Sequence, residues 1–195
     1  MTTFAFLDIE TTGLSPKKNF ILEVAWALTD ESFNLLRTPK TFIIDHGDAE
    51  AEVAQQIKDS AFITNMHAKS GLLDELADPE TEKLPMEDIL NEFVLDLMAL
   101  DRIEDQVRFA GYSVSFDRGF LAENGWGEII NEDSDSPFHM HHRILDLSTP
   151  KQIYEAAGVG LPQTPPNENP HRAIDDALDA LLVAQAFRDD VRELQ

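Results

Sequence analysis

Hydrophobic and polar residues alternate through the first quarter of the chain in the manner of β-strands. The pattern predicts strands over Thr3–Ile9, Ile21–Thr29 and Leu35–Ile44, the first of them rich in Phe and Ile. The polar turn Asp30-Glu31-Ser32 separates the second strand from the third. Strands joined in this way indicate an antiparallel meander.

Helical spacing of apolar residues dominates the rest of the chain. Ile89, Phe93 and Leu97 belong to such a pattern and predict a helix over 86–101. Leu161–Pro170 holds four of the ten prolines and is expected to be an extended loop. The same reading predicts helices over 49–58, 70–77, Phe116–Glu123, Thr149–Ala157 and His171–Val191, and short strands over Val107–Ala110 and Arg143–Leu147.

These elements predict an α/β fold with a mixed five-stranded sheet, in which three antiparallel strands and two more are flanked by helices. A chain of 195 residues is long enough for one domain with its own core, so we expect a single domain over 1–195. The acidic stretch 131–136 is expected to be a mobile loop.

The net charge of the chain restricts its partners. Asp and Glu number 37 against 15 Lys and Arg, which gives a formal net charge of −22. Proteins that hold long nucleic acids usually carry a basic face, because neutralised phosphates supply much of the affinity. A nucleic-acid substrate of this chain is therefore expected to be short. An acidic surface that serves solubility or a salty environment fits the composition equally well.

The composition also excludes several classes of site. The chain contains no cysteine, which excludes disulfides and thiolate metal sites. No apolar run approaches the roughly 18 residues of a membrane span, and the N-terminus lacks the pattern of a signal peptide. We therefore expect a cytoplasmic protein with no membrane partner.

Two carboxylates interrupt the apolar first strand. Asp8 and Glu10 stand two positions apart, so both side chains point to one face of the strand. Asp117 follows a later strand and opens a helix, where a single acid is also explained by the helix dipole. A fold that gathers such carboxylates forms a cage for hard divalent cations.

A histidine and a further acid flank the start of the last helix. The five-residue spacing from His171 to Asp176 corresponds to about 140° around an ideal helix. His171 is therefore predicted to lie just before the helix, on the proline loop, where it can bend over the metals and accept a proton from water. Asp175 competes with Asp176 for the role of ligand.

The three blocks Phe6–Gly13, Ser113–Phe120 and His171–Ala177 resemble the exonuclease motifs of the DEDD superfamily of 3′→5′ exonucleases, in its histidine-containing branch. The resemblance spans nearly the whole chain and implies a ribonuclease H-like fold. It implies that two Mg²⁺ or Mn²⁺ ions activate water and stabilise the leaving 3′ oxygen, with His171 as general base and a nucleoside 5′-monophosphate as product. The ligands would be Asp8, Glu10, Asp117 and Asp176.

Three further stretches are similar to the oligoribonuclease family. They are Leu14 after the first block, Phe62–Leu72, and His141–Thr149. The resemblance implies that Leu14 and an aromatic residue wedge the terminal bases, and that other side chains cap the 5′ phosphate of a dinucleotide. The candidate substrate-binding residues are Leu14, Phe62, His67, Ser113, Arg143 and Ser148.

Two positions depart from that family. Phe62 stands where tryptophan is usual, which keeps stacking but offers less surface. His142 stands where the partner subunit contributes a tyrosine. The resemblance also implies a homodimer, with partner contact expected at 139–142.

Other interpretations stay open at this stage. The tandem pair Lys17 and Lys18 could contact a longer single strand, as in an exonuclease that proofreads or trims DNA or RNA ends. The acidic surface also fits a non-catalytic metal-binding module that tethers a partner. A third alternative is a structural zinc ion held by His139, His141 and His142.

Overall fold

The computed structural model describes residues 2–100, 106–131 and 139–193. The expected mobile loop at 131–136 lies, from residue 132 onwards, outside the described residues. Within the described ranges, no helix combines the length and apolar character needed to cross a bilayer.

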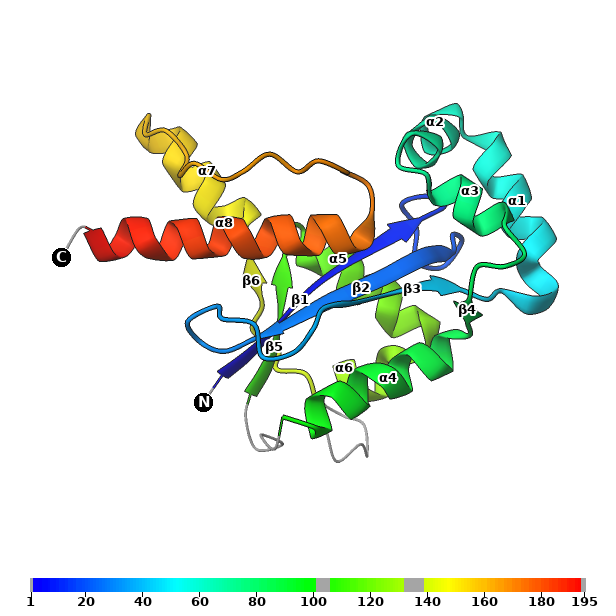
Figure 1. The fold of residues 1–195 in the computed structure, drawn as a ribbon, viewed down its shortest axis with the longest axis horizontal. Coiled ribbons are helices and arrows are strands. Elements are labelled where there is room, and N and C mark those ends of the chain that lie inside the picture. Colours follow the sequence, from blue (N-terminus) through cyan, green and yellow to red (C-terminus); the bar gives the residue numbers. More distant parts are fainter. Residues whose placement is uncertain (1, 101–105, 132–138, 194–195) are drawn as a thin grey trace.

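A mixed sheet with the strand order β4-β3-β2-β1-β5-β6 forms the centre of the molecule (Figure 1). The first three strands pair antiparallel, which confirms the predicted meander. Each of the remaining pairs, β1 with β5, β5 with β6 and β3 with β4, is parallel. The strands are β1 (Thr2–Thr11), β2 (Ile21–Thr29), β3 (Lys40–Ile44), β4 (Lys83–Leu84), β5 (Gln106–Gly111) and β6 (Leu145–Asp146).

The sheet has six strands among the described residues, where the sequence predicted five. The additional β4 is two residues long and carries no periodic pattern to detect. β3 begins at Lys40 instead of Leu35, and Leu35 forms only an isolated bridge with Thr29. Pro39 precedes the strand and cannot donate a ladder hydrogen bond, which explains the later start. β6 is likewise shorter than the predicted Arg143–Leu147.

The predicted helices lie close to their expected positions, but two described helices were not predicted: residues 61–69 and the four-residue Gly127–Ile130. The segment 61–69 forms a helix that the sequence pattern did not indicate, begun by the Ser60 hydroxyl, which accepts a hydrogen bond from the Ile63 amide. Gly71 has a φ of 79° and separates this helix from the next, so the helix predicted from residue 70 begins at Leu72. The α-helices are α1 (Glu50–Asp59), α2 (Ala61–Lys69), α3 (Leu72–Ala77), α4 (Met86–Met98), α5 (Val114–Leu121), α6 (Gly127–Ile130), α7 (Ser148–Ala157) and α8 (Ala173–Glu193). Two short turns, the 3-10 turn η1 (Gly47–Ala49) and the π turn η2 (Ala122–Trp126), complete the described elements.

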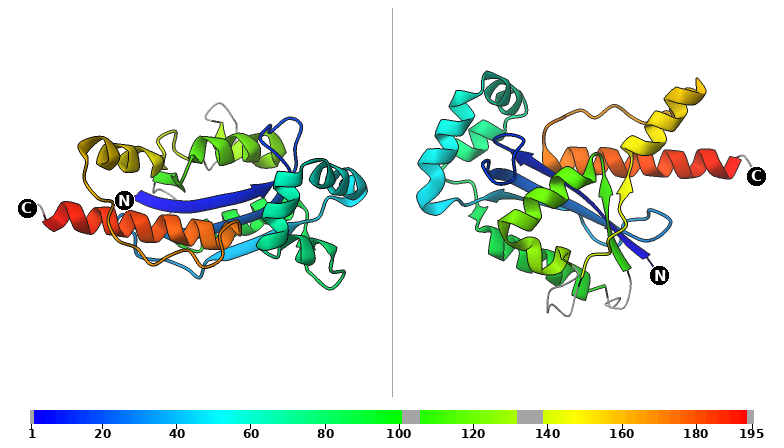
Figure 2. Two further views of the ribbon diagram at one scale, coloured as in Figure 1. Left: turned by 90° about the horizontal axis from the view of Figure 1, so that it is seen from above. Right: turned by 180° about the vertical axis from the view of Figure 1, so that it is seen from behind.

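Helix α8 covers one face of the sheet and crosses β1 and β2 (Figures 1 and 2). Its buried side is formed largely by alanines at helical spacing, Ala173, Ala177, Ala180 and Ala184. Because these side chains are small, the helix backbone approaches the strands closely. Acidic side chains near the start of α8 are thereby brought to the carboxylates of β1.

The opposite face of the sheet carries the larger core, under α4, α5 and α6 (Figure 2). Trp26 of β2 packs there against Phe93, with ring centroids 5.4 Å apart, and against Trp126 at 6.5 Å. Buried aromatic residues contribute a large apolar area each. This core fixes the central strands on which the candidate site is built.

Candidate active site

The first two candidate ligands lie on the face of β1 that α8 covers. Glu10 is buried and stands opposite Glu23 of β2, while Asp8 stands opposite Ala25. Alternation along β1 puts both carboxylates on the side of Phe6, which packs beneath α8. The two-residue spacing therefore places both acids in the same gap between sheet and helix.

Asp117 lies on α5, which packs on the face of the sheet opposite α8, and its carboxylate is close enough to Asp8 to raise the pKa of that acid. Gly111 ends β5 with a φ of 153°, and Ser113 adopts a left-handed φ of 50° before α5 begins. The buried Asp117 carboxylate accepts hydrogen bonds from the backbone of Asp117 and of Ile9. The bond to Ile9 ties α5 to β1 between the positions of Asp8 and Glu10.

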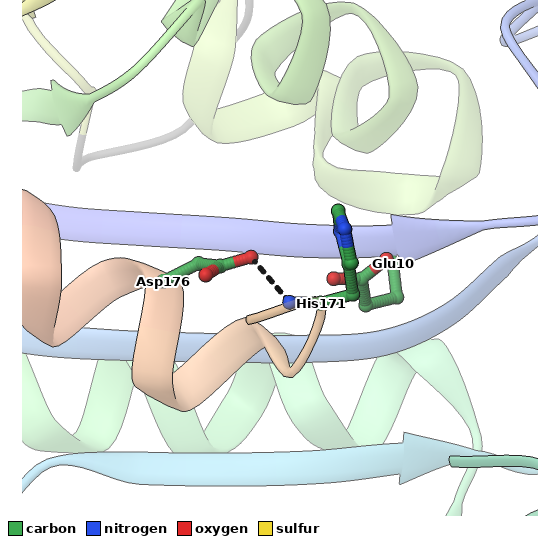
Figure 3. Close-up of side chains that lie close together, drawn as sticks. All are labelled: Glu10, His171 and Asp176. Carbon is green, nitrogen blue, oxygen red and sulfur yellow. Dashed lines mark hydrogen bonds between the residues drawn. The ribbon is translucent and has the colours of Figure 1, made fainter. Parts of the chain in front are cut away.

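His171 and Asp176 complete the candidate site from α8 and the loop before it (Figure 3). Ligand atoms of Glu10, His171 and Asp176 all lie within 4.8 Å of one another. The His171 amide donates to Asp176 Oδ2 at 3.1 Å, and Asn167 Nδ2 donates to Asp176 Oδ1 at 2.6 Å. His171 precedes the helix, which begins at Ala173, as the sequence predicted.

Asp175, the competing candidate, is held elsewhere. Its Oδ2 accepts a hydrogen bond from Asn169 Nδ2 at 3.3 Å. It is absent from the group formed by Glu10, His171 and Asp176. The geometry therefore favours Asp176 as the ligand.

Burial and mutual repulsion raise the pKa values of the clustered acids. Burial, followed by Asp176 and Glu23, raises the pKa of Glu10 to about 8. Burial and the charges of Asp117, Glu10 and Asp176 raise the pKa of Asp8 well above its ordinary range. Burial likewise raises the pKa values of Asp117 and Asp176. So many acids in one gap are unfavourable as anions unless a cation neutralises them.

The donor set fits a hard divalent cation. Carboxylate oxygens are the ligands that Mg²⁺ and similar ions prefer, and the imidazole of His171 lies beside them. Burial, followed by the charges of neighbouring acids, raises the pKa values of both Asp8 and Glu10, and a bound cation would offset both effects. These residues form a candidate metal-binding cluster.

The predicted substrate-binding residues are distributed around this cluster. Leu14 and Phe62 are 83% and 73% exposed and are free to contact a ligand. Ser113 and Ser148 are brought together, since the Ser113 amide donates to Ser148 Oγ at 3.2 Å. Arg143 is exposed, and its amide donates to His141 Nδ1 at 3.0 Å.

His67 has a different environment from the surface position expected of a phosphate cap. Its side chain is fully buried, with Nε2 3.1 Å from the Thr11 carbonyl oxygen and Nδ1 3.7 Å from Glu10 Oε2. The five-residue spacing puts it about 140° around α2 from Phe62, so one side chain faces inward and the other outward. His67 therefore lies beside Glu10 on the protein side of the acidic cluster and does not face solvent.

The sequence analysis missed four residues that support the site. Glu23, Glu75 and Arg172 form an ion cluster at the start of α8, in which Glu23 is buried and Glu75 is partly exposed. Glu23 is an acid within an apolar strand, the same signal that drew attention to Asp8 and Glu10, and could have been found by it. Asp146 Oδ1 accepts from the amides of Ser113 and Ser148, and its charge helps to raise the pKa of Asp117.

Two alternative sites find different support in the structure. His139, His141 and His142 do not form a metal-binding group in the described part of the chain, although the rings of His141 and His142 stack at 4.3 Å. Lys17 and Lys18 line an open hollow of about 740 Å³ together with Pro16, Asn19, Phe20, Glu52, Glu123 and Asn124.

Comparisons with known proteins show which family the chain belongs to. The family model described as Exonuclease (RNase_T) matches residues 5–184. An oligoribonuclease of Streptomyces griseus is 30% identical over 95% of this chain and 85% of its own length. A probable oligoribonuclease of Dictyostelium discoideum is 28% identical over 94% of this chain and 87% of its own.

The fold has neighbours among solved structures. Exonuclease I of E. coli, in a zinc-bound complex with single-stranded DNA, aligns with a TM-score of 0.67 at 16% sequence identity. The alignment covers 100% of this chain and 42% of the exonuclease I chain, so this chain spans less than half of that protein. The ribonuclease H-like exonuclease fold is thus confirmed. From the match over residues 5–184, the chain belongs to the RNase T family of exonucleases.

Proposed function

We propose that this protein is a metal-dependent 3′→5′ exonuclease that hydrolyses short oligoribonucleotides to nucleoside 5′-monophosphates. The observation that carries the proposal is the meeting of Glu10, His171 and Asp176 within 4.8 Å. The oligoribonuclease relatives, which align over most of this chain, support the substrate class. We propose that residues 1–195 act as one exonuclease domain.

In this proposal, Asp8, Glu10, Asp117 and Asp176 hold two Mg²⁺ or Mn²⁺ ions. When bound, such ions polarise the scissile phosphate, favour ionisation of the attacking water and stabilise the leaving 3′ oxygen. In their charged form, the four carboxylates would neutralise the positive charge of the ions and fix their positions relative to the substrate. Glu10 and Asp117 are buried, so bulk water has little access to these two carboxylates.

His171 is proposed as the general base. Its side chain is exposed at the mouth of the cluster, while its backbone amide is fixed to Asp176. One of its ring nitrogens accepts a proton from the attacking water, whose oxygen bonds to phosphorus as the bond from phosphorus to the 3′ oxygen of the preceding nucleotide breaks. The 3′ oxygen takes up a proton from solvent, and the terminal nucleotide leaves as a 5′-monophosphate. The other product is an oligonucleotide that is one residue shorter and ends in a 3′ hydroxyl.

The proposed substrate contacts follow the exposure of the side chains. Leu14 and Phe62 are available to stack against terminal bases, since both are largely exposed. Ser113, Ser148 and Arg143 are proposed to bind the 5′ phosphate, and the contact between the two serines supports a common role. His67 can join that phosphate contact only if α2 moves, because its ring is buried against Glu10.

Turnover of matched 5′-labelled RNA and DNA, 2 to 20 nucleotides long, tests the proposal with Mg²⁺ and with Mn²⁺. We expect fast cleavage of RNA 2-mers to 4-mers, a sharp decline for longer chains, and no turnover with chelator. Equal or faster processing of 20-mers would contradict the proposed end-binding contacts. No metal-stimulated cleavage of any substrate would favour a non-catalytic metal-binding module.

A second candidate is an exonuclease acting on longer single-stranded ends. The observation that favours it is the open hollow beside Lys17 and Lys18, which offers room for further nucleotides. Preferential cleavage of DNA 20-mers in the same assay would support this candidate. Replacing both lysines by glutamine would then reduce cleavage of 20-mers and leave 2-mers unaffected.

We also propose that the protein forms a homodimer in which the segment 139–142 contacts the partner. The stacked rings of His141 and His142 present an aromatic surface where such contact is expected. Light scattering coupled to size-exclusion chromatography measures the mass in solution. A mass of 21.9 kDa, that of one chain, would contradict the dimer.

A further inference from the structure

We propose that Arg172 is a positioning residue, which fixes the catalytic loop by bridging Glu23 of β2 and Glu75 of α3. The inference rests on the proposed function, because it assigns a role to the residue that follows the proposed general base. A guanidinium stays protonated and cannot ligate a metal, so Arg172 is not itself a candidate ligand. Its effect would be exerted through His171.

The guanidinium of Arg172 is bonded on two sides. On one side, Nε and Nη2 donate to the Glu23 carboxylate, with the shortest distance 2.9 Å. On the other side, Nη1 and Nη2 donate to the two oxygens of Glu75, at 2.7 and 2.9 Å. Paired hydrogen bonds from one planar group to two carboxylates define its position and orientation. A lysine ammonium could not reproduce both pairs.

Glu23 is the anchor of this arrangement. It is 0% exposed, and in addition to Arg172 it accepts hydrogen bonds from the Thr41 hydroxyl at 3.1 Å and from the Ala173 amide at 2.9 Å. A buried carboxylate without a partner is strongly unfavourable, so Arg172 and Glu23 are held together. The first turn of α8 is thereby fixed to the central sheet at the strand position opposite Glu10.

The loop needs such an anchor because His171 has an unfavourable backbone conformation. Its φ of 67° lies in the left-handed region, which is uncommon for a residue with a side chain. Pro170 precedes it, and the His171 amide donates a hydrogen bond to Asp176 Oδ2 at 3.1 Å. The two residues that follow, Arg172 and Ala173, both bind Glu23. Release of this anchor would let His171 relax away from Glu10.

The anchor also joins three elements around the site. Figure 1 shows the N-terminal end of α8 directed towards the α1–α3 region, where Arg172 contacts Glu75. α3 directly follows α2, which carries Phe62 and His67. The same guanidinium therefore couples the position of the proposed base to the helices that carry two proposed substrate contacts.

The test compares three changes at the anchor with one control. R172M combined with E23Q removes the Arg172–Glu23 ion pair without leaving an unpaired buried charge. R172K keeps the positive charge but not the paired hydrogen bonds. E75Q removes only the charge of the more exposed partner, Glu75. The control is R188M, since Arg188 lies on α8, sixteen positions beyond Arg172, and pairs with Asp189 at 2.8 Å. The kcat and KM of each protein are measured on an RNA dinucleotide. NMR spectra of ¹³C-labelled histidine are recorded for each protein, and the signal that is missing in H171A is assigned to His171.

We expect kcat to fall about 10- to 100-fold in R172M/E23Q while KM changes less than about threefold, because a misplaced base affects the chemical step. R172K and E75Q should lie between this variant and wild type. In the metal-free protein, the His171 signal should shift or broaden in R172M/E23Q and stay unchanged in R188M.

A wild-type kcat and an unchanged His171 signal in R172M/E23Q would overturn the proposal. If that variant does not fold, R172K and E75Q decide, and wild-type behaviour of both would overturn it equally. The NMR readout does not depend on turnover. An inactive wild-type protein would therefore refute the proposed function, while the histidine signals still report whether Arg172 positions His171.

Discussion

Glu10 is the residue at which protons and cations compete most directly. Burial and neighbouring acids raise its pKa to about 8, so at neutral pH a metal ion must displace a proton from it. We expect the apparent Mg²⁺ affinity to weaken by at least about tenfold per pH unit below pH 8, because the raised pKa values of Asp8 and Asp117 add to the proton release. Isothermal titration calorimetry in buffers of different ionisation enthalpy measures both affinity and proton release.

The matched variant for this experiment is E10Q, which removes the proton exchange but keeps the shape of the side chain. Its pH dependence should be shallower by about one proton. An Mg²⁺ affinity that is the same at pH 6 and pH 8 in the wild-type protein would contradict the raised pKa.

The same shift determines how metal-free stability depends on pH. The folded-state pKa of Glu10, about 8, lies above its ordinary value of 4.5. The associated stability is fully present below pH 4.5 and is lost as pH rises through 8. A bound divalent ion offsets this loss, so the difference in Tm between Mg²⁺-loaded and metal-free protein should widen from pH 6 to pH 9.

Substitution of His171 separates catalysis from metal binding. We expect H171A to lose about 10²- to 10⁴-fold in kcat, the usual contribution of a general base. Mg²⁺ binding should persist, because the four carboxylates remain. Single-turnover cleavage and calorimetry measure the two properties independently. H46A, at a half-buried histidine after β3, serves as the control, and wild-type turnover in H171A would refute the assignment.

Single residues also show where sequence reasoning succeeds. The placement of Asp8 and Glu10 on one face could be predicted because residues two apart in a strand point to the same side. The burial of His67 could not, since it depends on the long-range approach of α2 to Thr11. The role of Arg172 could not be predicted, because its partners Glu23 and Glu75 are distant in sequence and only the fold brings them to it.

At the scale of elements, Asp96 joins α4 to β2 and to the segment before β3. The carboxylate is 2% exposed and accepts a hydrogen bond from Trp26 Nε1 at 3.0 Å, and it pairs with Arg37 and Lys40. Both cations are partly exposed and can return to water when the acid is lost. The indole N–H cannot, because Trp26 is buried.

We therefore expect D96A to lower the free energy of unfolding by about 1–3 kcal/mol, mainly through the unpaired indole N–H. Urea denaturation followed by tryptophan fluorescence measures this change. E92Q provides the control, because Glu92 binds Lys40 at the surface and its loss should cost about 0–1 kcal/mol. Equal stability of D96A and wild type would show that the buried bond contributes nothing.

Elements were predictable from sequence in proportion to their length and regularity. The long periodic helices α4 and α8 and the strands β1 and β2 lie where their patterns placed them. The two-residue strands β4 and β6 are defined only by pairing with neighbours that are distant in sequence. Helix α2 was not predicted because its apolar residues do not form one helical face: Phe62 is exposed, while Ile63 and the polar His67 are buried.

At the scale of the whole molecule, the net charge of −22 opposes the approach of an anionic substrate. Each added nucleotide brings another phosphate, so repulsion should grow with substrate length. Ions bound at the carboxylate cluster attract the scissile end locally but do not compensate for a long strand. The charge thus supports selection for short substrates without any specific contact.

This argument predicts an unusual response to salt. Monovalent ions screen repulsion between exposed charges over about 10 Å at 0.1 M, so kcat/KM for an RNA 20-mer should rise with KCl relative to a 2-mer, at constant Mg²⁺. A nuclease with a basic groove shows the reverse, because salt releases the strand from its cationic contacts. A steep loss of 20-mer cleavage with salt would therefore point to local cations that hold the strand. Lys17 and Lys18 line the hollow where such contact would occur, and their replacement by glutamine would remove that salt dependence.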